Sequence, residues 1–182
     1  MKKKILIGIS IVVAAFIVWS LYGLFFATPA SPKGTAEITS GDLSVNVTYS
    51  RPYKKGRLIF GEESAGALQP YGQYWRLGAN AATEITVNKD VSFAGEAVEA
   101  GTYRMYVVPG ATEWEVSLNS ETGVFFGAAE PNYELDVLKV KVPVQTAPEL
   151  EQFTISFEPD STGVNMNFVW DTSKVTVPIT PQ

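Results

Sequence analysis

The chain has 182 residues, of which 46% are apolar and 18% are charged, and its formal net charge is −5. A chain of this length supports one hydrophobic core, so we expect one folded domain. It contains no cysteine, which excludes disulfides and thiolate chemistry, and no histidine, which excludes imidazole metal ligands and every catalytic triad that uses histidine. No catalytic residue, metal site or cofactor is predicted.

The N-terminus combines three lysines at positions 2–4 with an uncharged apolar run from Ile5 to Ala27. A helix of these 23 residues would be roughly 35 Å long, enough to cross a hydrocarbon layer of about 30 Å. Because lysines stay on the cytoplasmic side, we predict that residues 1–27 anchor the chain in the inner (cytoplasmic) membrane, with the rest periplasmic or extracellular. The alternative is a signal peptide that is cleaved near Ser31, which would make the protein secreted.

The residues after this segment differ from it in charge and in pattern. Residues 28–35 contain two prolines and predict a tether, so the folded domain is expected at 36–182. All 19 acidic residues but only 11 of the 14 basic ones follow Ala27, which gives this part of the chain a net charge of −8. Such a charge argues against nucleic acid as a partner.

Along the predicted domain, apolar residues recur with a period of two, which is typical of strands with one buried face. The alternating sets lie at 43–49, 85–87, 91–93, 103–107, 114–118, 138–142, 153–157, 164–170 and 175–179. About nine short strands separated by turns predict an all-β fold, an antiparallel β-sandwich of the jelly-roll or immunoglobulin-like kind.

Two motifs between residues 49 and 83, YSRPYKKGRLIFG and PYGQYWRLGANAAT, place a cluster of basic residues in this acidic chain. The patterns RPxxKGRxIFG and PYGxxWRxGANxxT, followed by AGTYRMYVVP and WEVSLN, resemble a family of exported bacterial proteins built around a single domain of unknown function. The resemblance covers residues 31–179 and implies an all-β domain and export by a signal peptide or lipid anchor, without an established activity. This chain lacks the lipobox cysteine, so lipid anchoring is not expected here.

The motif side chains have two alternative interpretations. Arg51 continues the alternation of the strand at 43–49, so its guanidinium starts on the core face, where a charge must be paired. The structural interpretation gives it an internal carboxylate, with Asp136 as the main candidate and Glu84 and Asp171 as others. In the ligand interpretation, guanidinium groups converge on a carboxylate, sulfate or phosphate, beside an aromatic stacking platform. The candidate ligand-binding residues are Arg51, Arg57, Arg76, Asn80, Thr83, Tyr71 and Trp75.

Three functions are compatible with these observations. The first, which we expect in preference to the others, is a membrane-anchored extracytoplasmic module that binds an anionic or carbohydrate ligand of the envelope. The second is a structural envelope protein with no small-molecule site, in which the motifs serve only the scaffold. The third is a histidine-free enzyme, such as a carboxylate-dependent glycosidase or a lyase that uses tyrosine and arginine.

Overall fold

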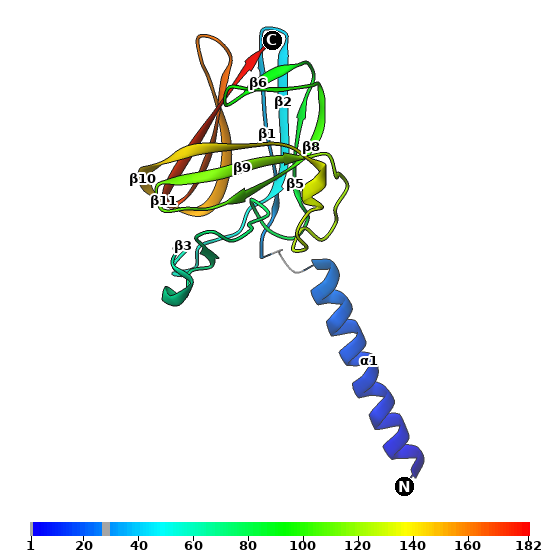
Figure 1. Ribbon diagram of the computed structural model, residues 1–182. Helices are drawn as coiled ribbons and strands as arrows, with labels where there is room; N and C mark the ends of the chain where they lie inside the picture. Colours follow the sequence, from blue (N-terminus) through cyan, green and yellow to red (C-terminus); the bar gives the residue numbers. More distant parts are fainter. Residues whose placement is uncertain (1, 27–29) are drawn as a thin grey trace. The chain divides into compact units, whose positions relative to one another are not determined.

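The computed structural model describes residues 2–26 and 30–182, and within the N-terminal helix the side chains of residues 8–22. The chain divides into two units, Met1–Ala30 and Ser31–Gln182. The first contains helix α1 (Lys2–Phe26; Figure 1). Within the described part of the chain, no helix has both the length and the apolar character needed to cross a membrane. The two ends of the predicted span, 5–7 and 23–27, carry side chains that lie outside the described residues.

The second unit is built on one antiparallel sheet, to which the described residues contribute nine strands in the order β1-β2-β5-β8-β9-β10-β11-β6-β7. The strands are β1 (Lys33–Ser40), β2 (Leu43–Ser50), β5 (Thr83–Val87), β6 (Val91–Phe93), β7 (Glu96–Val98), β8 (Gly101–Val108), β9 (Glu113–Asn119), β10 (Asp136–Pro159) and β11 (Val164–Pro181). A two-residue parallel pair, β3 (Phe60–Gly61) with β4 (Gln69–Pro70), lies outside this sheet, as do the 3-10 helices η1 (Glu63–Ala65) and η2 (Tyr133–Leu135).

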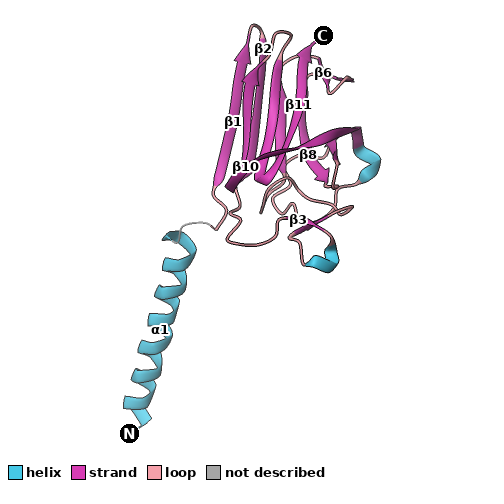
Figure 2. Ribbon diagram, turned by 90° about the vertical axis from the view of Figure 1, so that its left-hand side faces the viewer, coloured by secondary structure: helices cyan, strands magenta, loops and turns pink. Residues whose placement is uncertain are grey.

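Two long strands fold the sheet back on itself. Strand β10 pairs with β9 through residues 136–143 and then with β11 through residues 144–159, and its register shifts twice between Thr146 and Thr154. Such irregularities bend a strand, so one continuous strand belongs to both layers. Figures 1 and 2 show β1 and β2 side by side, with the first part of β10 crossing their direction. The result is the expected all-β, sandwich-like arrangement.

The number of strands in the sheet matches the prediction, but the strands differ. The alternating sets at 138–142 and 153–157 are one strand, β10, and those at 164–170 and 175–179 are one strand, β11. Strands β1 and β7 escaped prediction because each is at an edge, pairs with one neighbour and has few buried side chains. Strand β1 begins at Lys33, within the residues predicted as a tether.

An aromatic cluster fills the centre of the core. Its rings come from five separate segments of the chain: Phe60, Trp75, Trp114, Phe153 and Trp170. The ring centroids of Phe60 and Trp114 are 4.7 Å apart, and those of Trp75 and Trp170 are 5.8 Å apart in a stacked pair. Such pairs contribute about 0.5–1.5 kcal/mol each beyond the area they bury. Since Phe60 and Trp75 belong to the two motifs, both motifs are tied to the core.

Candidate functional site

The first motif docks onto the bend in β10 and β11. The backbone N–H of Lys54 donates to the carbonyl of Glu151 at 2.7 Å. Its ammonium donates to Asp171 Oδ1 at 2.8 Å and to Glu149 Oε1 at 2.6 Å. The hydrogen bonds to Asp171 and Glu149 raise the pKa of Lys54 above its usual value, so the ammonium stays charged. This lysine therefore serves the scaffold.

Arg51 is also held by β10, and no carboxylate of the described residues pairs with it. Its Nη2 donates to Thr154 Oγ1 at 2.9 Å and its Nε to the Phe153 carbonyl at 3.4 Å. The prediction that Asp136 pairs with a motif arginine is wrong. Instead, Lys139 Nζ lies 3.0 Å from Asp136 Oδ2. The error has a topological cause, because Asp136 begins β10 beside β9 whereas Arg51 contacts the second half of the same strand.

The other two motif arginines have separate partners. Arg57 donates to the backbone carbonyls of Tyr53 and Lys54, and so closes the turn that they form. Arg76 Nη1 reaches the carbonyl of Asn80 at 3.5 Å. Within the described part of the chain, no two of the three predicted arginines share a hydrogen-bond acceptor, so their side chains do not converge on one point.

The aromatic and polar candidates of the second motif are largely structural. Trp75 is 2% exposed and belongs to the core, so it is not a stacking platform. Thr83 is fully buried and donates to the Leu77 carbonyl at 2.7 Å. Tyr71 packs against the core. Asn80 has a left-handed backbone (φ 59°) and is exposed.

The second motif holds one long connection, which we name the β9–β10 loop (residues 120–135). The N–H of Gly127 donates to the Asn80 carbonyl at 2.8 Å, and the N–H of Ala82 donates to the Val124 carbonyl at 3.0 Å. The Tyr74 hydroxyl donates to the Gly127 carbonyl at 2.8 Å. A Cβ at position 127 would lie 2.7 Å from the nitrogen of Ala82, so only glycine allows this approach.

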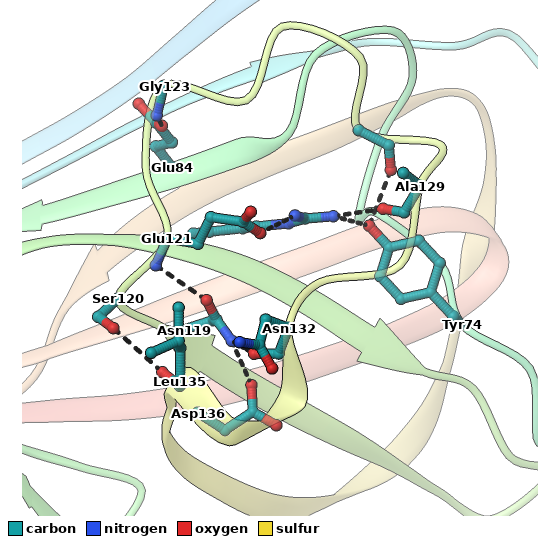
Figure 3. A network of polar contacts seen from close by, with 12 residues as sticks. Tyr74, Glu84, Asn119, Ser120, Glu121, Gly123, Ala129, Asn132, Leu135 and Asp136 are labelled. Carbon is teal, nitrogen blue, oxygen red and sulfur yellow. Dashed lines mark hydrogen bonds and ion pairs between the residues drawn. The ribbon is translucent and has the colours of Figure 1, made fainter.

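A buried arginine outside the motifs, on the sheet face that the β9–β10 loop covers, also holds this loop. Arg104 on β8 is 1% exposed. Its Nη1 donates to Glu121 Oε2 at 2.6 Å, and its Nη2 donates to the Ala129 carbonyl at 2.6 Å and to the Tyr74 hydroxyl at 2.7 Å. Figure 3 shows Glu121, Ala129 and Tyr74 gathered around these contacts. Sequence reasoning missed Arg104, because the alternation of Tyr103, Met105 and Val107 assigns it to the solvent face.

Arg104 belongs to a line of polar residues that crosses six strands, which we name the polar row. Successive cross-strand partners form it, one from each of β1, β2, β5, β8, β9 and β10: Thr35, Thr48, Glu84, Arg104, Asn119 and Asp136. Directly opposed side chains lie on the same face of a sheet, so these six share one face. No motif of the sequence contains this line, because it depends on strand register.

The β9–β10 loop covers half of the polar row. Under it, Asn119 Nδ2 donates to Asp136 Oδ1 at 2.7 Å and to the Asn132 carbonyl at 2.9 Å. The Tyr106 hydroxyl donates to Asp136 Oδ2 at 2.7 Å. Figure 3 shows Asn119 between Asn132 and Asp136. These contacts hold the loop on the sheet, while the buried Nε of Arg104 has no hydrogen-bond partner among the described residues.

The other half of the row lies open in a groove of about 380 Å³. Thr35, Thr48 and Glu84 line it together with Lys33, Val124 and Phe125. The N–H of Gly123 donates to Glu84 Oε1 at 2.5 Å, which ties the loop to the edge of the groove. Phe125 is 88% exposed on this edge, and the next residue, Phe126, is 67% exposed.

Three tyrosines near the covered half are hydrogen-bond donors at neutral pH. Burial raises the pKa of Tyr74 and of Tyr106 above the usual value. Burial and the hydrogen bond to Glu130 raise the pKa of Tyr133 to about 12. A phenol with so high a pKa is a poor general base near pH 7. Among the described residues, no group of three or more His, Cys, Asp or Glu side chains is placed to hold a metal ion.

Comparison with known proteins places the second unit in a family. No curated protein and no solved structure is significantly similar to the chain. A family described as "Protein of unknown function (DUF2911)" matches residues 31–179, which is nearly all of the second unit and the same range as the resemblance that the two motifs indicated. The chain belongs to this family of proteins of unknown function.

Proposed function

We propose that the second unit, residues 31–182, is a carbohydrate-binding module whose site is the open half of the polar row. The observation that carries the proposal is a groove whose largely apolar lining holds three polar side chains of the polar row, with an exposed aromatic ring at its edge. A sugar ring presents hydroxyl groups at its rim and C–H groups on its faces, so it is bound by polar side chains together with an aromatic ring.

The floor of the groove offers polar groups that the fold does not use. Thr35 and Thr48 are exposed cross-strand partners, and within the described residues neither hydroxyl has a hydrogen-bond partner. Glu84 uses one carboxylate oxygen to accept from Gly123 and keeps the other available. Two hydroxyls and a carboxylate oxygen on three adjacent strands match the donors and acceptors along a sugar ring.

The ring of Phe125 is presented by a loop that is already ordered. The β9–β10 loop is fastened on one side by Ala82 and Asn80 and from below by Arg104. Binding then requires little further loss of conformational entropy, which favours affinity. Phe125 and Phe126 together expose an apolar surface to water, and such exposed apolar surfaces commonly mark binding sites.

Charge favours a carbohydrate over an anion as the ligand. The part of the chain after Ala27 carries a net charge of −8, which repels anions at long range. Of the basic residues, Lys33 lines the groove, whereas the predicted arginines Arg51, Arg57 and Arg76 do not. The anionic ligand considered from the sequence is therefore the weaker option.

Two adjacent phenylalanines provide a matched test. The full-length chain is purified in detergent and screened for binding on a glycan array. Its affinity for soluble β-glucan oligosaccharides and for N-acetylglucosamine oligosaccharides is then measured by calorimetry. Phe125→Ala removes the ring that lines the groove, and an aromatic contact of about 1–1.5 kcal/mol predicts roughly five- to tenfold weaker binding. Phe126→Ala removes a similarly exposed ring that does not line the groove and leaves the affinity unchanged.

The alternative is a structural envelope protein, and it is supported by the scaffold role of Lys54 and Trp75 in the two motifs. It predicts that no glycan on the array binds. If a glycan binds and the two phenylalanine variants lose the same affinity, the groove is not its site and the proposed location is wrong.

We also propose that residues 1–27 anchor the protein in the inner membrane, with the second unit outside. The support is the sequence: three lysines followed by an uncharged apolar run of 23 residues. The measurement is the mass of the protein extracted from the membrane fraction. A full-length mass agrees with an anchor, whereas a product that starts near Ser31 would show cleavage and secretion.

A further inference from the structure

We infer that a second pocket, on the Tyr133 side of the β9–β10 loop, binds a primary ammonium group such as that of a lysine side chain. The pocket has a volume of about 470 Å³, and its polar and aromatic lining consists of Gln73, Tyr74, Glu130 and Tyr133. None of these residues lines the groove proposed for carbohydrate. The inference therefore stands independently of that proposal.

The aromatic walls of the pocket are fixed in place. The rings of Tyr74 and Tyr106 have centroids 5.5 Å apart, and those of Tyr106 and Tyr133 are 5.9 Å apart. Tyr106 is buried between them and donates to Asp136. Tyr74 is held by Arg104 and Gly127. An ordered pair of electron-rich rings is the kind of surface that attracts a cation through its π face.

A carboxylate completes the pocket. Glu130 Oε2 accepts from the Tyr133 hydroxyl at 3.0 Å, which leaves Oε1 available. Among the described residues, no basic side chain lies within ion-pair distance of Glu130. The carboxylate is thus oriented toward the tyrosine and has no cation of its own.

The protein already binds one ammonium group with the same two chemical groups. Lys139 Nζ lies 5.0 Å from the centroid of Tyr133 and 3.0 Å from Asp136 Oδ2. An aromatic face and a carboxylate oxygen together hold this cation. The Arg104 guanidinium carbon lies 5.9 Å from the centroid of the Tyr74 ring, so this ring also already faces a cation of the protein. The pocket adds the carboxylate of Glu130 beside these two tyrosines, and the net charge of −8 after Ala27 attracts a further cation from outside.

The test compares ligands that differ in charge and in source. Binding of the full-length chain is measured by calorimetry at low salt with a tetralysine peptide, with the same peptide acetylated on every lysine, and with spermidine. Acetylation removes the positive charge and is expected to abolish binding. Tighter binding of the peptide than of spermidine assigns the site to a peptide partner, and the reverse assigns it to free polyamines.

Two neighbouring carboxylates supply the matched variants. Glu130→Gln is expected to weaken tetralysine binding about five- to tenfold, whereas Glu134→Gln, an exposed neighbour that does not line the pocket, leaves it unchanged. Tyr133→Leu weakens binding and Tyr133→Phe keeps most of it, because the ring is retained. Equal binding of acetylated and unmodified peptide, or equal losses in the two glutamate variants, overturns the inference. Melting temperatures measured in parallel identify any variant that has unfolded.

Discussion

At the scale of single residues, burial and hydrogen-bond partners separate scaffold from site. Arg51 and Thr83 are conspicuous in the sequence, yet their polar groups are used by the backbone and side chains around them. Thr35 and Thr48 are inconspicuous in the sequence, yet among the described residues their hydroxyls have no partner. A polar side chain whose hydrogen bonds are already made contributes to stability, while an exposed one without partners remains available to a ligand.

Thr83→Val tests the scaffold role of a predicted ligand residue. Valine fills the same space but leaves the Leu77 carbonyl without the hydrogen bond that Thr83 donates at 2.7 Å. An unsatisfied buried acceptor costs about 1–3 kcal/mol, so the free energy of unfolding in urea should fall by that amount. Thr86→Val, at an exposed position of the same strand, should change it by no more than about 0.5 kcal/mol. Equal effects of the two substitutions would contradict the assignment.

At the scale of elements, both motifs serve to attach loops. The first fastens the 53–57 turn to the bend of β10 through Lys54 and Glu151, and the second fastens the β9–β10 loop through Asn80 and Ala82. The loop in turn separates the open groove from the tyrosine pocket, since Phe125 lines one and Glu130 lines the other. The motifs thus act on the candidate sites indirectly, by ordering the loop between them.

Gly127→Ala tests this attachment. The added Cβ would lie 2.7 Å from the nitrogen and 2.9 Å from the Cα of Ala82, so the loop must move away from the sheet. Overpacking of about 1–3 kcal/mol predicts amide hydrogen exchange faster by roughly five- to 150-fold at Gly127 and Ala82, whose N–H groups hold the contact.

The control for the loop is Gly61→Ala. Its Cβ would first meet Leu58 Cδ2, a flexible side-chain atom, at 3.3 Å. Exchange at Gly127 and Ala82 should stay as in the unmodified protein. If amide exchange at Gly127 and Ala82 is equally slow in Gly127→Ala and in the unmodified protein, the close approach of loop and sheet does not hold the loop in place.

At the scale of the whole molecule, the composition and three tyrosines with raised pKa values set the response to pH. Without histidine, the chain lacks the side chain that ordinarily titrates between pH 5 and 8, so the free energy of unfolding should vary little from about pH 6 to 8. Tyr74, Tyr106 and Tyr133 have raised pKa values in the folded state. An unfolded chain releases these protons near pH 10, while the folded chain keeps them.

The expected result is alkaline destabilisation. Because the folded state binds more protons above about pH 10, the free energy of unfolding falls as the pH rises through about 12. Urea unfolding at a series of pH values measures this slope. Tyr106→Phe removes one of the titrating groups and should make the slope shallower, even if it lowers stability at pH 7 by removing the bond to Asp136. An unchanged slope would show that Tyr106 does not contribute.

The sequence by itself determined the class of the fold, the family and the excluded chemistries. Strands such as 43–49 and 114–118 were predictable because alternation is a local consequence of the extended backbone. The absence of cysteine and histidine needed no structure either. The edge strand β1 was not predictable in this way, because a strand with one neighbour and an open face needs few apolar residues and so lacks the alternating pattern.

Only the tertiary structure decided which side chains meet. The polar row requires the register of six strands, which brings residues as distant in the sequence as Thr35 and Asp136 into one line. Arg104 is buried because the β9–β10 loop covers a face that alternation assigns to solvent. The register of the strands and the covering of the sheet by the loop both depend on contacts between distant segments. The pattern within one strand therefore cannot contain them, and the candidate sites appear only once the sheet is assembled.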